Sequence, residues 1–257
     1  YDNSVGKTFL EAGYTNIQIG NWWGIDSRSK YASITYSWSS WGQLPYTLFQ
    51  ATAWYDLSNF LFDGGNKIVR SANMRMFDRL GSIPNNPEPT YTFFHTTMPH
   101  SPYLFDAEGK PTAVWSGTEA EVRDAYLSQL EFTTTKLEEV ITRILDNSDI
   151  PPIILICADE GYSGPDWYNY DTTNKGVDNI LTREPVLALE RQSGLFALYD
   201  PYATTAELEQ LKSPVNSFRV IFNSILNSKL GILPDRYFLK SLVQFYGPFI
   251  EITSQLP

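Results

Sequence analysis

The spacing of apolar residues along the chain predicts helices that alternate with strands. In residues 67–80 the apolar side chains recur at four-residue intervals, which places them on one face of a helix. Residues 153–157 are instead apolar at every position, as in a strand covered on both faces. We expect helices over residues 4–13, 67–80, 118–146 and 215–225, and strands over 15–20, 91–95, 153–157 and 195–199. This alternation favours an α/β fold, a three-layer α/β/α sandwich with a mainly parallel central sheet.

Two of the predicted helices carry recognisable end signals. Gly13 can supply the left-handed residue that ends the first helix. Thr118 and Glu121 have the spacing of a capping box, in which each side chain bonds the backbone amide of the other residue. The residues expected to face the core from the helix 118–146 are Tyr126, Leu130, Leu137, Ile141, Ile144 and Leu145.

Composition narrows the class of protein. The 257 residues, 42% hydrophobic and 15% aromatic, suffice for one sizeable core, so we expect a single domain over residues 1–257. A formal charge of −10 argues against a nucleic acid partner, because the phosphates would be repelled. No apolar stretch reaches the roughly 18 residues that a membrane helix needs. The single cysteine, Cys157, lies in the most apolar run and is expected to be a buried hydrophobic side chain.

Three polar segments directly follow predicted strands. They are residues 20–23, 95–100 and 159–161. In open α/β sheets, ligands bind outside the carboxyl ends of the strands, where the connecting loops diverge. The sequence therefore directs the search for a functional site to these segments.

Asp159 and Glu160 are adjacent acids at the end of the strand 153–157. Two carboxylates held close together repel each other unless a cation or a shared proton intervenes, and a divalent cation with oxygen ligands would resolve that conflict. Two alternatives stay open. Asp159 can cap the next loop while Glu160 points to water, or the two acids can form the proton-transfer pair of a metal-free hydrolase.

The only histidines in the chain, His95 and His100, follow the strand 91–95 in one proline-containing loop. Histidine suits metal ligation, acid/base catalysis or contact with an anion near neutral pH, although a single structural role for each is the simpler alternative. Arg183 could bind an anion through two hydrogen bonds or pair with Glu184 at the surface. Trp22 and Trp23 could line a pocket wall or only cover the end of the sheet.

The order of these segments resembles the sulfatase-like branch of the alkaline phosphatase superfamily, in particular bacterial membrane-anchored proteins related to lipoteichoic acid synthases and phosphoethanolamine transferases. The similar segments run from Leu10-Glu11-Ala12-Gly13-Tyr14 through Pro99-His100-Ser101-Pro102-Tyr103 and Asp159-Glu160-Gly161 to Leu233-Pro234-Asp235-Arg236. The resemblance implies an alkaline phosphatase-like sandwich. It also implies that a divalent metal (Mn, Mg, Ca or Zn) binds Asp159, with His95 and His100 at the pocket.

The resemblance further implies a function and a setting. Relatives hydrolyse or transfer phosphate or sulfate esters, so the expected substrate is a small anionic ester or a lipid head group. The expected location is the extracytoplasmic face of a membrane or the exterior, with any anchor preceding Tyr1. The alternative is a non-catalytic binding or scaffold domain that keeps the fold.

Two departures from the family pattern bear on activity. Relatives have Asp-His-Gly where this chain has Asp159-Glu160-Gly161, so a carboxylate replaces an imidazole ligand. The nucleophile of the family precedes the segment that resembles Leu10 to Tyr14, so it is expected upstream of Tyr1. The catalytic residue itself is therefore unknown from these residues, and Ser27, Ser29 and Thr35 lack both the position and a nearby base.

Overall fold

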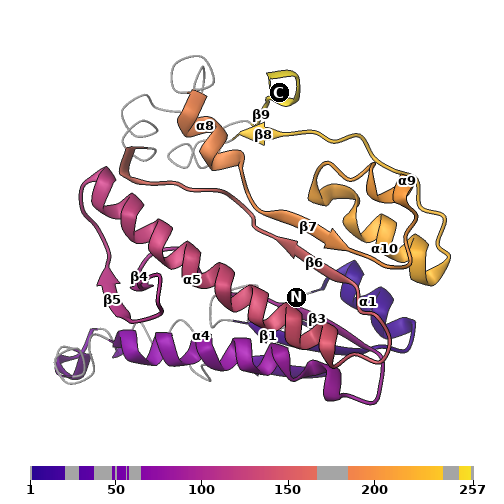
Figure 1. Cartoon of the computed structure of the whole chain (residues 1–257), viewed down its shortest axis with the longest axis horizontal. Coiled ribbons are helices and arrows are strands. Elements are labelled where there is room, and N and C mark those ends of the chain that lie inside the picture. Colours follow the sequence, from indigo (N-terminus) through magenta and orange to yellow (C-terminus); the bar gives the residue numbers. More distant parts are fainter. Residues whose placement is uncertain are drawn as a thin grey trace. The chain divides into compact units, whose positions relative to one another are not determined.

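The computed structural model describes residues 2–20, 29–37, 48–49, 51–55, 57, 65–166, 185–239 and 249–255. The chain falls into two compact units, residues 1–150 and residues 151–257. Each unit has its own helices and strands (Figure 1). The expectation of one undivided domain stays a prediction.

A small parallel sheet organises residues 1–150. Strand β1 (Thr15–Gly20) lies in the centre, with β2 (Ile34–Ser37) on one side and β3 (Thr90–Phe94) on the other, and both neighbours run parallel to it. Ile17 and Ile19 of β1 are almost completely buried. The α/β class and the strands expected at 15–20 and 91–95 are confirmed, whereas the three-layer sandwich stays a prediction.

The helix α1 (Ser4–Glu11) leads into the central strand. The side chain of Asn3 caps its first turn by accepting a hydrogen bond from the Gly6 amide. At its other end Gly13 has φ of 87°, and the amides of Gly13 and Tyr14 donate to the carbonyl oxygens of Leu10 and Phe9. This is the left-handed cap that the glycine predicts, because a residue without Cβ adopts that conformation at little cost.

Two long helices, α4 (Asn66–Gly81) and α5 (Glu119–Asp146), lie side by side in the first unit (Figure 1). The capping box of Thr118 and Glu121 begins α5, as predicted. Between these helices and the strands β3 and β4 (Tyr103–Phe105) lies a cluster of buried side chains. Its members are Phe77, Met98, Leu104, Phe105, Phe132 and Val140.

The predicted core face of α5 is partly confirmed, because Leu137 and Ile144 pack against this cluster. The buried residues of this helix are Val122, Gln129, Phe132, Thr133 and Val140, whereas Leu145 is 41% exposed. Two of the five buried residues, Gln129 and Thr133, are polar, so a stripe chosen by hydrophobicity alone includes only part of the contact face. On α4, similarly, Ile68 is 51% exposed although it belongs to the predicted apolar stripe.

The connections of the first unit are short. The 3-10 helix η3 (Ile83–Asn85) lies in the proline-rich loop between α4 and β3. Strands β4 and β5 (Pro111–Val114) form an antiparallel hairpin before α5. This hairpin follows the segment that contains both histidines, so the second half of that segment is tied to α5 through β4.

The second unit contains a different strand arrangement. Strand β6 (Ile154–Cys157) pairs with β7 (Phe196–Tyr199) in antiparallel orientation, with α8 (Pro185–Gln192) between them in the chain (Figure 1). The strands themselves were predicted, but complete burial of the segment 153–157 was wrong. Its first residues are half-buried and Cys157 is exposed.

The remaining elements of the second unit follow β7 in the chain. They are α9 (Thr205–Leu208), η4 (Pro214–Asn216), α10 (Ser217–Leu226), β8 (Phe238–Leu239), β9 (Ile250–Glu251) and η5 (Thr253–Gln255). Asn216 is fully buried, and its amide both donates to and accepts from the backbone of Leu233. Among the described helices of both units, none combines the length and the apolar character that crossing a membrane requires.

Candidate functional site

His95 lies at the carboxyl edge of the parallel sheet. It directly follows β3, and its backbone amide donates to the Ile19 carbonyl oxygen at 2.9 Å, which extends the pairing with β1 beyond the last strand residue. The imidazole stacks on the Phe93 ring with the ring centroids 6.5 Å apart. Because β1, β2 and β3 are parallel, the carboxyl ends of all three strands lie at this edge of the sheet. This is the edge where α/β proteins bind ligands.

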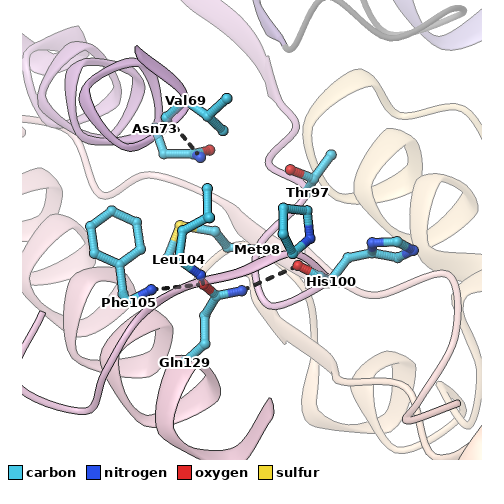
Figure 2. A pocket seen from close by; sticks show the side chains of 9 residues that line it. Val69, Asn73, Thr97, Met98, His100, Leu104, Phe105 and Gln129 are labelled. Carbon is cyan, nitrogen blue, oxygen red and sulfur yellow. Dashed lines mark hydrogen bonds between the residues drawn. The ribbon is translucent and has the colours of Figure 1, made fainter. Parts of the chain in front are cut away.

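His100 lies five residues further on and is exposed. A turn precedes it, in which the His100 amide donates to the Thr97 carbonyl oxygen at 2.7 Å. The imidazole Nδ1 is 2.5 Å from the carbonyl oxygen of Ser101. The ring points away from the side chains of Met98 and Leu104 and is open to solvent (Figure 2).

Two buried amide side chains fix the segment between the histidines and the following strand. Asn73 of α4, 3% exposed, accepts a hydrogen bond from the Thr96 hydroxyl at 3.2 Å, and that hydroxyl accepts from the Met98 amide. Gln129 of α5, 1% exposed, donates to the carbonyl oxygen of His100 at 3.2 Å (Figure 2). Each helix therefore holds one part of the segment from within the core.

Beside these amides lies a cavity of about 20 Å³. Residues from α4, the histidine segment, β4 and α5 line it, and Figure 2 shows them. That volume is enough for about one water molecule and too small for a phosphate or a sulfate ester. The cavity is consequently a feature of the packing behind the segment and not the place where a substrate binds.

Asp159 and Glu160 follow β6 in the second unit and differ in their surroundings. Asp159 is exposed, whereas Glu160 is half-buried and forms an ion pair with Arg191 in the last turn of α8. The Arg191 side chain is only 12% exposed. An ion pair that is partly removed from water holds its partners more firmly than a surface pair, so Arg191 neutralises a carboxylate that was predicted to bind metal.

The backbone around these acids is hydrogen-bonded to the last turn of α8 and to the residues that follow it. The amide of Ala158 donates to the Leu195 carbonyl oxygen at 2.8 Å, and that of Gly161 donates to the Arg191 carbonyl oxygen at 2.9 Å. Residues 158–161 are thus anchored at both ends by the segment that carries Arg191. This arrangement keeps Glu160 beside the guanidinium and leaves Asp159 at the surface.

Cys157, the last residue of β6, has little nucleophilic character. Although the residue is exposed, neighbouring protein atoms partly desolvate the thiol and raise its pKa, and the negative charge of Asp159 raises it further. The thiol is therefore protonated at neutral pH, and only the thiolate attacks electrophiles or binds metals.

The remaining predicted site residues cannot be placed. Arg183, Trp22 and Trp23 lie outside the described residues, as does Ser27. Within the parts of the chain that the structure describes, no three histidine, cysteine, aspartate or glutamate side chains gather in a metal-binding cluster. The structure describes the histidines in the first unit and the two acids in the second.

Sequence reasoning missed three residues around the candidate site. Asn73 and Gln129 look like polar surface positions of amphipathic helices, and their backbone partners are distant in the sequence. Arg191 follows Glu160 by 31 positions (191 minus 160), and no local pattern links the two residues. No family model, no curated protein and no solved structure matches the chain, so the family resemblance and the roles it implies stay predictions.

Proposed function

We propose that the chain is part of a divalent-metal-dependent hydrolase or transferase that acts on a small phosphate or sulfate ester. The observation that carries this proposal is that polar side chains directly follow the strands at their carboxyl ends: His95 follows β3, and Asp159 follows β6 after one residue. A divalent cation held by Asp159 would polarise the ester and stabilise the charge that develops on the transferred group.

Asp159 is the stronger metal-ligand candidate of the two acids in this proposal. It is exposed and can reach a cation from solvent, whereas the carboxylate of Glu160 is already paired with Arg191. His100 and His95 are the candidate contacts to the ester anion, and Arg183 is a further one. The nucleophile belongs to no residue that we can name.

The second candidate function is a non-catalytic binding or scaffold domain with the same fold. The Glu160–Arg191 ion pair favours it, because a guanidinium beside the acids repels a divalent cation. In this alternative the two acids belong to a turn that α8 holds in place. The chain then binds a partner without catalysing a reaction.

Manganese binding separates the two functions. We expect the purified chain to bind Mn²⁺ stoichiometrically in equilibrium dialysis, and Asp159→Asn to lose that binding. Arg191→Met should strengthen binding, because it releases the Glu160 carboxylate and removes a repelling charge. Asp149→Asn is the matched control, since Asp149 is also exposed in a loop of the described chain but does not follow a strand.

The opposite result would favour the binding domain. If neither the wild type nor Arg191→Met takes up Mn²⁺, or if Asp149→Asn reduces binding as much as Asp159→Asn does, the metal-dependent function is wrong.

A further inference from the structure

The side chain of Gln129 connects both ends of the segment 100–105. Its amide nitrogen donates to the His100 carbonyl oxygen at 3.2 Å, and its oxygen accepts from the backbone amides of Leu104 at 2.7 Å and Phe105 at 3.2 Å. All three contacts are with backbone groups, and the side chain is 1% exposed (Figure 2). One buried side chain therefore fixes the separation between His100 and β4.

The segment so held contains the short contact between the His100 Nδ1 and the Ser101 carbonyl oxygen, at 2.5 Å. A carbonyl oxygen only accepts hydrogen bonds, so Nδ1 must carry the proton. In the neutral imidazole, Nε2 then has the free lone pair, and the exposed ring presents that atom to solvent. This pattern, with Nδ1–H on a backbone carbonyl and Nε2 free, is how proteins orient histidines that bind metals or exchange protons.

We infer that Gln129 is a positioning residue, which holds His100 in the Nδ1-protonated tautomer with Nε2 directed outward as its functional atom. Without the Gln129 bonds, the carbonyl of His100 and the amides of Leu104 and Phe105 lose the partner that fixes the segment. The geometry that brings the Ser101 carbonyl to Nδ1 would then no longer be enforced. The functional importance of this positioning rests on the proposed function, because the outward Nε2 can accept a proton, and the imidazolium can then donate a hydrogen bond from Nε2 to the ester anion.

Histidine NMR tests the inference in the full chain. Because the chain has only two histidines, selective ¹⁵N labelling gives two imidazole spin systems, and His95→Gln assigns them. When the ring is neutral, we expect the ¹⁵N shifts of wild-type His100 to report the Nδ1-protonated tautomer. In Gln129→Met, which removes both halves of the contact, the Nε2-protonated form preferred by a free imidazole should gain population.

Two further variants isolate the contact. Gln129→Glu keeps an oxygen for the Leu104 and Phe105 amides but faces the His100 carbonyl with an acceptor, so it should also shift the tautomer. Thr133→Val is the matched control, since Thr133 is buried one turn further along α5 and bonds only the Gln129 carbonyl oxygen in its own helix. It should leave the His100 spectrum unchanged while circular dichroism shows that each variant is folded.

The outcomes are distinguishable from those of the proposed function. The inference is overturned if wild-type His100 populates the Nε2-protonated tautomer, or if folded Gln129→Met retains the wild-type spectrum. Titration with inorganic phosphate then addresses the function. Phosphate binds the imidazolium, in which both nitrogens carry protons, and we expect Gln129→Met to weaken this binding by about tenfold, because Nε2–H is no longer held outward and one hydrogen bond to a charged group is lost. A wild-type tautomer as expected with no response to phosphate supports the positioning role and counts against the ester-binding function.

Discussion

Gly161 lies so close to the end of α8 that no side chain fits there. A Cβ atom at this position would be 1.9 Å from the carbonyl oxygen of Glu190, which is backbone and cannot move aside as a side chain does. A glycine here allows residues 158–161 to approach the helix that carries Arg191.

Gly161→Ala should therefore destabilise the second unit. We expect a loss of about 1–3 kcal/mol in the free energy of unfolding, as for overpacking elsewhere in protein interiors. Urea denaturation followed by circular dichroism measures it. Gly231→Ala is the control, because a Cβ there meets nothing within 4 Å, and it should change stability by no more than about 1 kcal/mol. Equal effects of the two substitutions would contradict the steric role of Gly161.

The strands β8 and β9 are two residues long each, too short for their ladder alone to define the pairing. Side chains reinforce it. Arg236 forms a two-point ion pair with Glu251, and the Tyr237 amide donates to the Thr253 hydroxyl at 2.9 Å. The Arg236 guanidinium also lies 4.9 Å from the centroid of the Phe238 ring. Side-chain contacts as well as backbone hydrogen bonds therefore hold β8 and β9 together.

The contribution of the Arg236–Glu251 ion pair to stability should depend on pH. The hydrogen bond from Arg236 lowers the pKa of this carboxyl from 4.5 to about 2. Since the folded-state pKa is depressed, the contribution to stability is complete above 4.5 and disappears as the pH falls towards about 2. NMR titration of the Glu251 carboxyl should show its pKa returning towards 4.5 in Arg236→Gln. An unchanged titration would exclude the ion pair as the cause.

Among the described residues, two hydrophobic clusters of the first unit consist of side chains from residues 1–150. One joins α4, α5, β4 and the histidine segment, and the other joins Ile17 and Ile19 of β1 to Met76 of α4. None of their described members comes from residues 151–257. A unit that contains its own core meets the physical requirement for independent folding.

Residues 1–150 expressed alone should therefore fold and unfold cooperatively, which thermal circular dichroism would show. Residues 1–130 are the control, because this fragment lacks Phe132 and Val140 of the core cluster and should not fold. A gradual, non-cooperative transition for residues 1–150 would mean that both units share one folding unit, as the expectation of a single domain implies.

Local patterns in the sequence determined the elements of this protein. The helix periodicity of residues 67–80, the capping box of Thr118 and Glu121, and the cap at Gly13 each involve residues within a few positions of one another. Such signals act before any tertiary contact forms, so they predicted helices and strands close to those observed. They also identified His95 and Asp159 as polar residues at strand ends.

Only the tertiary structure decided which faces and partners these elements use. The antiparallel pairing of β6 with β7, the polar contact face of α5 and the ion pair of Glu160 with Arg191 all join groups far apart in the chain. Gln129 is the clearest case. Its buried amide is stabilised by backbone groups of residues 100–105, and no pattern in the sequence around Gln129 identifies these partners. Hydrophobicity predicts burial from the residue alone, whereas a buried polar side chain is stable only through partners that the fold provides.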